Sequence, residues 1–177
     1  MHVNSRSFTL IELMIVVVLV CILVVITTPR TSFFQQQTIL ADLHRLFTVF
    51  SFVQYKAMAS NTQQTITFDL EKKSYTYLSL SNKETTVTLA SGNMFGVIHG
   101  VKGPPSSLTS LIKKAITFQS PSGELRANLM TNGKISPGTV YLINQKTTIL
   151  CALTCPVSQV SYIRLYVYRN GQWTNLP

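Results

Sequence analysis

Acidic residues, histidines and cysteines are scarce in this chain. Of its 177 residues, 6 are aspartate or glutamate and 15 are lysine or arginine, which gives a formal net charge of +9. This charge suits an acidic partner, whether nucleic acid, phospholipid headgroups or an acidic subunit, but does not choose among them. None of His2, His44 and His99 lies beside a candidate nucleophile, and the sequence has no glycine-rich phosphate loop. We therefore predict that the chain is not an enzyme and uses no cofactor.

Two further patterns resemble chemical sites. Asp69 and Glu71 resemble a catalytic carboxylate pair, but their place before two lysines is more simply explained by a charged turn. Cys151 and Cys155 have no histidine nearby, and structural zinc sites need four ligands, so we predict no metal site. A bend between the two cysteines would allow a disulfide bond, whereas two residues four apart on one straight strand cannot bond. In an oxidising compartment we predict the bond.

A long apolar run occupies the N-terminal region. Between Phe8 and Ile26 the only polar residues are Thr9 and Glu12, and a helix of this length extends roughly 28 Å, about the thickness of a bilayer core. We predict a membrane span at residues 8–28. Glu12 is either an interfacial residue without a role or a charge retained for a function. A secretory signal peptide is disfavoured, because the run is too long and no small-x-small cleavage pattern follows it.

Beyond Pro29, apolar residues recur at spacings of three, four and seven. The apolar stripe is Leu40, Leu43, Phe47, Phe50 and Ala57, and the charged residues off it are Asp42, Arg45 and Lys56. This pattern predicts an amphipathic helix that continues to about Ala59 and packs on a sheet.

From Gln64 onward, short alternating runs rich in Thr, Tyr, Val and Ile predict strands, and a short helix is predicted at Ser107–Lys114. The predicted strands are Thr65–Leu70, Ser74–Leu80, Thr85–Ala90, Ala115–Gln119, Thr139–Ile143, Thr147–Ala152 and Val160–Arg169. A long N-terminal helix followed by an antiparallel sheet is the α+β arrangement. The part beyond the span is long enough for one domain.

The last strand leads into an Asn170-Gly171 pair, which favours a type I′ hairpin turn. Alternation places the aliphatic residues of this strand on one face and Tyr162, Arg164, Tyr166 and Tyr168 on the other. The Tyr/Arg face, with Arg164 and Arg169 as its candidate cations, is a nucleic-acid candidate. The simpler interpretation is an exposed sheet face with cross-strand aromatic pairs.

The order Phe8-Thr9-Leu10-Ile11-Glu12, after a basic leader and before an unbroken apolar run, resembles the type IV prepilin signal of pilins and of type II secretion pseudopilins. The resemblance implies that a prepilin peptidase cuts between Ser7 and Phe8 and methylates the Phe8 amine. Ser7 departs from the glycine that the family normally has before the cut. Glu12 and Pro29 stand where the family has its glutamate and commonly a proline, which implies assembly roles for Phe8, Glu12 and Pro29.

The resemblance also implies an organisation and a location. Residues 1–7 form the leader, residues 8–28 the membrane segment, and residues 29–177 an amphipathic helix with a β-rich domain. The protein is expected in the bacterial inner membrane, with the leader in the cytoplasm and the C-terminal domain in the periplasm. Its expected partners are the inner membrane, the prepilin peptidase and other pseudopilins or minor pilins.

Later segments are similar to the GspH/FimT group of pilin-like proteins, namely Val53–Ala59, Ile66–Asp69 and Gly138–Leu142. This similarity implies a minor pseudopilin near the tip of the type II secretion pseudopilus. The alternative is a FimT-like minor type IV pilin in pilus assembly or DNA uptake. Some FimT-like members bind DNA through a Gly-Arg-x-Arg motif, of which Ser161–Arg164 keeps only the last arginine. We therefore favour the pseudopilin, a structural assembly protein.

Overall fold

A computed structural model describes residues 9–27, 31–105, 110–120, 123–144, 149–156 and 162–176. The chain divides into two compact units, Met1–Thr31 and Ser32–Pro177. Helix α1 (Leu10–Thr27) belongs to the first unit, and helix α2 (Thr31–Ser60) leads into the second. Over the described residues, the structure contains no helix with both the length and the apolar composition that a membrane crossing requires. Residues 8 and 28, the ends of the predicted span, lie outside the described residues, and the span stays a prediction.

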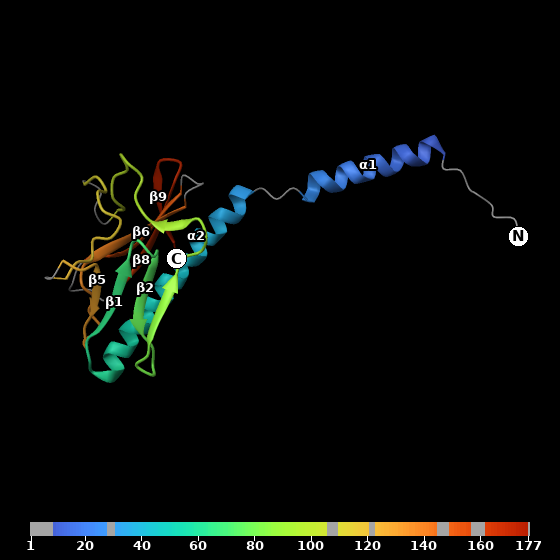
Figure 1. The fold of residues 1–177 in the computed structure, drawn as a ribbon. Coiled ribbons are helices and arrows are strands. Elements are labelled where there is room, and N and C mark those ends of the chain that lie inside the picture. Colours follow the sequence, from blue (N-terminus) through green and yellow to red (C-terminus); the bar gives the residue numbers. More distant parts are fainter. Residues whose placement is uncertain are drawn as a thin grey trace, which may run out of the picture. The chain divides into compact units, whose positions relative to one another are not determined.

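The second unit contains two antiparallel sheets (Figure 1). The first has the strand order β3-β2-β1-β5 and the second the order β4-β6-β7-β8-β9. The strands are β1 (Gln64–Asp69), β2 (Ser74–Leu78), β3 (Glu84–Thr88), β4 (Asn93–Phe95), β5 (Arg126–Leu129), β6 (Gly138–Asn144), β7 (Leu150–Cys155), β8 (Arg164–Arg169) and β9 (Gln172–Leu176). One helix packed on antiparallel sheets confirms the predicted α+β, pilin-like fold.

Helix α2 packs against both sheets through one apolar cluster. Leu43, Phe50 and Ala57 of the predicted stripe are fully buried, and Leu40 and Phe47 are partly buried against the same cluster. Residues of the first and second sheets complete it, among them Ile66, Phe68, Val140, Leu142 and Leu153. The apolar residues that recur along the helix and those that alternate along the strands therefore form one common core.

A second, smaller cluster covers the opposite face of the second sheet, which we call the outer face. It contains Tyr141, Leu150, Ala152 and Tyr166 from the strands, together with Val101 and Ile112 from the segment between β4 and β5. That segment forms a ribbon of residues 101–103 and 110–112, in which Lys102 bridges Leu111. The second sheet is thus covered on both faces.

Two charged residues predicted to lie off the apolar stripe are buried between α2 and the sheets. Asp42 accepts hydrogen bonds from the N–H of Ala90 at 2.8 Å and the side-chain amide of Asn93 at 2.7 Å. The Lys56 ammonium donates to the carbonyls of Leu78 at 3.3 Å and Ser79 at 2.7 Å, and to Asn82 Oδ1 at 2.9 Å. Their partners explain why these charges tolerate burial.

Most of the predicted elements are confirmed, with small changes at their ends. The prediction of a strand at Ala115–Gln119 is wrong, because only Ile116 forms a bridge there, to Val140, while the rest of the segment packs beside β6. The predicted helix at Ser107–Lys114 is also wrong over its described part, since Ser110–Lys114 is extended and Ile112 pairs with Val101. Strands β4 and β5 were not predicted, because each is very short.

Candidate functional site

The first turn of α1 is capped by Thr9. The Thr9 carbonyl accepts from the N–H groups of Glu12 at 3.1 Å and Leu13 at 3.2 Å, and its hydroxyl accepts from the Glu12 N–H at 3.4 Å. Thr9 is therefore the N-cap, and Glu12 lies in the first turn, where the helix dipole favours a negative charge. This cap was not predicted, although Thr-x-x-Glu is the sequence signature of a capping box.

From Leu10 to Leu23 the side chains of α1 are exposed, and nearly all of them are apolar. Leu10 is 78% exposed near one end and Leu23 is 60% exposed near the other. Between them the exposed apolar side chains are Ile11, Leu13, Met14, Ile15, Val16, Val17, Val18, Leu19, Val20 and Ile22. A helix that is apolar all round is normally buried in a large assembly or in lipid.

Glu12 is the only acidic side chain on α1, and it is exposed among these apolar groups. In apolar surroundings a carboxylate needs a positive partner or hydrogen-bond donors. The predicted processing and assembly residues Ser7, Phe8 and Pro29 lie outside the described residues. Their roles, and that of Glu12, stay predictions.

The model of the prokaryotic N-terminal methylation motif matches residues 3–28. The motif indicates a type IV pilin-like protein. In a type IV pilin-like protein, this motif supports cleavage by a prepilin peptidase, N-methylation and assembly with other pilins. The matched family is a structural motif and not an enzyme family. The match includes Ser7, Phe8 and Glu12 and ends just before Pro29. Comparisons of the chain with curated proteins and with solved structures found no match.

The structure does not bring the candidate nucleic-acid residues together. Arg164 and Arg169 are five positions apart on β8, so their side chains leave opposite faces of the sheet. Arg164 lies on the outer face, with its guanidinium 4.6 Å from the centre of the Tyr162 ring, and a hydrogen bond to Tyr166 raises the pKa of Arg164. Arg169 lies with Leu40 of α2 in a small cleft of about 220 Å³ on the other face. The two arginines therefore do not form one cationic face.

Of the tyrosines of that predicted face, Tyr162 is exposed, Tyr168 is half-buried and Tyr166 is buried. Tyr166 is 3% exposed and belongs to the cluster under the ribbon. Tyr168 packs against Trp173 of β9 with the ring centres 5.2 Å apart. This cross-strand aromatic pair agrees with the simpler interpretation, but the face is half covered rather than open.

The predicted disulfide bond between Cys151 and Cys155 is contradicted by the structure, in which both thiols are free. Both residues lie on the single strand β7, paired with Leu142 and Gly138 of β6. Four steps along a strand separate Cα atoms by about 13 Å, well beyond the reach of a disulfide bond. Burial raises the pKa of each thiol to about 12.

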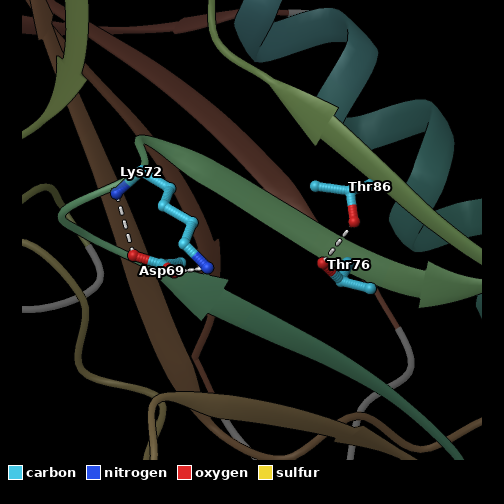
Figure 2. Close-up of polar contacts among 4 residues, drawn as sticks. All are labelled: Asp69, Lys72, Thr76 and Thr86. Carbon is cyan, nitrogen blue, oxygen red and sulfur yellow. Dashed lines mark hydrogen bonds and ion pairs between the residues drawn. The ribbon is translucent and has the colours of Figure 1, made fainter.

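The turn after β1 confirms the prediction that Asp69 belongs to a charged turn. Asp69 Oδ1 accepts from the Lys72 N–H at 2.9 Å, and Oδ2 lies 3.6 Å from the Lys72 ammonium (Figure 2). On the neighbouring strands, the hydroxyls of Thr76 and Thr86 form a cross-strand hydrogen bond of 3.0 Å. Within the described part of the chain, no three His, Cys, Asp or Glu side chains are grouped to hold a metal ion.

Proposed function

We propose that this chain is a minor structural subunit of a type II secretion pseudopilus, a pseudopilin of the GspH/FimT group that joins the filament near its tip through its N-terminal helix. The supporting observation is α1, which carries exposed, almost entirely apolar side chains from Leu10 to Leu23 and one carboxylate in its first turn, within the matched methylation motif. The proposal extends the pilin-like assignment to a particular machine and position.

In this proposal the prepilin peptidase removes residues 1–7 in the inner membrane and methylates the Phe8 amine. Residues 8–28 anchor the subunit in the bilayer until it enters the filament, and the sheets lie in the periplasm.

Glu12 would pair with the Phe8 amine of an adjacent subunit inside the filament. Both groups leave water when the helices pack together, so each needs the other as its partner. Removing one partner leaves the other buried without compensation, at a cost on the order of 3–5 kcal/mol. The pair would thus select for correctly processed neighbours, because only cleavage creates the Phe8 amine.

The test is co-purification of full-length variants with the other pilin-like subunits from membrane extracts. Glu12→Gln keeps the shape of the side chain and removes its charge. We expect the amount of partner subunits that co-purify with this variant to fall more than tenfold. Ile15→Leu, a change between apolar residues on the same helix, is the matched control and should retain them. Normal recovery of partners with Glu12→Gln would remove this pair from the mechanism.

The alternative, a FimT-like minor pilin that binds DNA, is favoured by the net charge of +9. The separation of Arg164 from Arg169 and the burial of Tyr166 weigh against the face that the sequence suggested for it. We therefore expect binding to mixed-sequence DNA that disappears near physiological salt, as nonspecific phosphate contacts do. Micromolar binding at about 150 mM salt, lost on Arg164→Ala, would favour the DNA-uptake pilin.

A further inference from the structure

The half of the chain that builds the second sheet has almost no carboxylates. After Glu84 the sequence contains one acidic residue, Glu124, and its side chain is paired with Arg126 at 2.7 Å. Lys102 and Lys113 are exposed beside the outer face of the second sheet. Because no carboxylate of this sheet opposes these lysines, its outer face favours an anionic ligand.

A cleft of about 670 Å³ lies where the ribbon meets β6, a volume typical of small-ligand sites. It is lined by Lys113 and Lys114, which are both exposed, and by Thr117, Thr139 and Tyr141. The wall is held in place by backbone bonds to β6, including Tyr141 N–H to the Ala115 carbonyl at 2.7 Å. The cleft thus places two exposed lysines on a fixed frame, beside the buried Tyr141 and beside Thr117, whose hydroxyl accepts from the Thr139 N–H at 2.7 Å.

A second cleft of about 530 Å³ is built around Trp173. The indole N–H donates to the Lys102 carbonyl at 2.9 Å, and the ring packs against Tyr168, so the orientation of the indole is fixed. Gly100 and Gly171 also line the cleft, and a Cβ added at either would meet no atom within 4 Å. A fixed aromatic ring beside open backbone gives a flat, apolar surface with polar groups at its rim.

The two clefts adjoin the same ribbon. Lys102, in the lining of the Trp173 cleft, is the bridge partner of Leu111, in the lining of the lysine cleft. The N–H of Gly103 donates to the Ser110 carbonyl at 3.0 Å and completes the pairing. An extended ligand that crosses the ribbon would contact both clefts.

We propose that the outer face of the second sheet binds an acidic polysaccharide, with the apolar face of a sugar ring on Trp173 and a sugar carboxylate at Lys113 and Lys114. Among the described residues that line the two clefts there is no arginine and no helix N-terminus, the groups that most often recognise phosphate. Carboxylated sugars therefore fit better than nucleic acid. This inference concerns the sheets and does not depend on the proposed pseudopilin role.

Trp173 is the only tryptophan of the chain, so its fluorescence reports directly on this face. The experiment titrates the full-length protein in detergent with hexagalacturonate and, separately, with the neutral maltohexaose. We expect the tryptophan emission to change and saturate with the acidic hexamer, at least tenfold more tightly than with the neutral one. Equal affinity for both hexamers would overturn the role of the lysines.

The variant Lys113→Gln/Lys114→Gln should weaken binding of the acidic hexamer about tenfold, as the loss of two exposed charge contacts predicts. Lys72→Gln/Lys83→Gln removes the same charge from exposed positions on the first sheet and should change the affinity less than twofold. An equal loss of affinity in both variants would show that the hexamer responds only to the net charge of the protein, and would overturn the proposal. Displacement of the hexamer by inorganic phosphate or single-stranded DNA at equal or lower concentration would also overturn it.

Discussion

Asp42 connects three elements through buried polar groups. Its carboxylate on α2 accepts from Ala90 and Asn93, and Asn93 Oδ1 in turn accepts from the side-chain amide of Asn144 on β6 at 2.6 Å. All three side chains in this series are buried. Such a network fixes the register of the helix against β4 and β6, which apolar contacts alone specify less strictly.

Asp42→Ala should lower the free energy of unfolding by about 2–4 kcal/mol, because it leaves the Ala90 N–H and the Asn93 amide buried without their acceptor. The measurement is urea unfolding followed by far-UV circular dichroism. His44→Ala, an exposed position on the same helix, is the control and should change the free energy by less than about 0.5 kcal/mol. Equal effects of the two substitutions would show that the network adds nothing.

The thiols of Cys151 and Cys155 should resist alkylation in the folded protein. Burial raises the pKa of each to about 12, so both stay protonated at pH 8 and lie out of reach of reagent. Because the folded state holds the thiols protonated, their burial adds to the free energy of unfolding. This addition is complete below the ordinary thiol pKa near 9 and is lost as the pH rises toward 12. In a Cys21→Ser background, iodoacetamide should label neither thiol before unfolding and both after unfolding without reductant. Failure to label the unfolded chain until reductant is added would indicate a disulfide bond.

The elements differ in how well the sequence predicts them. Helix α2 is predictable because its apolar period runs through many turns, and β1 and β2 are predictable because each alternates between two turn signals. Strands β4 and β5 carry too few residues for a period, and they exist because long-range partners pair with them. The same dependence on partners explains why Ala115–Gln119 is not a strand. The segment contains residues that favour strands, but only Ile116 forms a bridge, to Val140.

Of the candidate sites, only the N-terminal motif could be predicted from the sequence. The order of residues from Phe8 to Glu12 is a local motif, and it agrees with the matched family model. The clefts on the outer face require residues of β6, β9 and the ribbon, which are distant in sequence. No local pattern signals that Lys113 lies beside Tyr141 or that Trp173 bonds to Lys102.

Two glycines at strand ends should respond to substitution for different reasons. Gly171 has φ of +83° and open space around it, so Gly171→Ala should cost about 1 kcal/mol through backbone strain alone. At Gly138 a Cβ would lie 2.3 Å from the Phe118 ring, and Gly138→Ala should cost about 2–3 kcal/mol by displacing that buried side chain. Urea unfolding compares the two variants. A larger loss at Gly171 would contradict this ranking.

At the scale of the whole molecule, the structure separates two kinds of apolar surface. Among the side chains that the structure describes, the apolar core of the second unit begins at Ile39, and it joins α2 to both sheets. The described apolar side chains of α1, from Leu10 to Leu23, are exposed instead. The apolar burial that stabilises the second unit therefore comes from its own residues, and its folding does not need α1.

A chain that begins at Ser32 should consequently fold but fail to assemble. Its core and sheets are complete, so its thermal unfolding in buffer should be cooperative, with a midpoint within about 3 °C of that of the full-length protein in mild detergent. Co-purification with the other pilin-like subunits should fall at least tenfold, because the truncated chain lacks the apolar helix and Glu12. The full-length Ile15→Leu variant serves as the control for assembly. Recovery of the truncated chain with its partners at the full-length level would place the assembly contacts on the sheets and overturn the role given to α1.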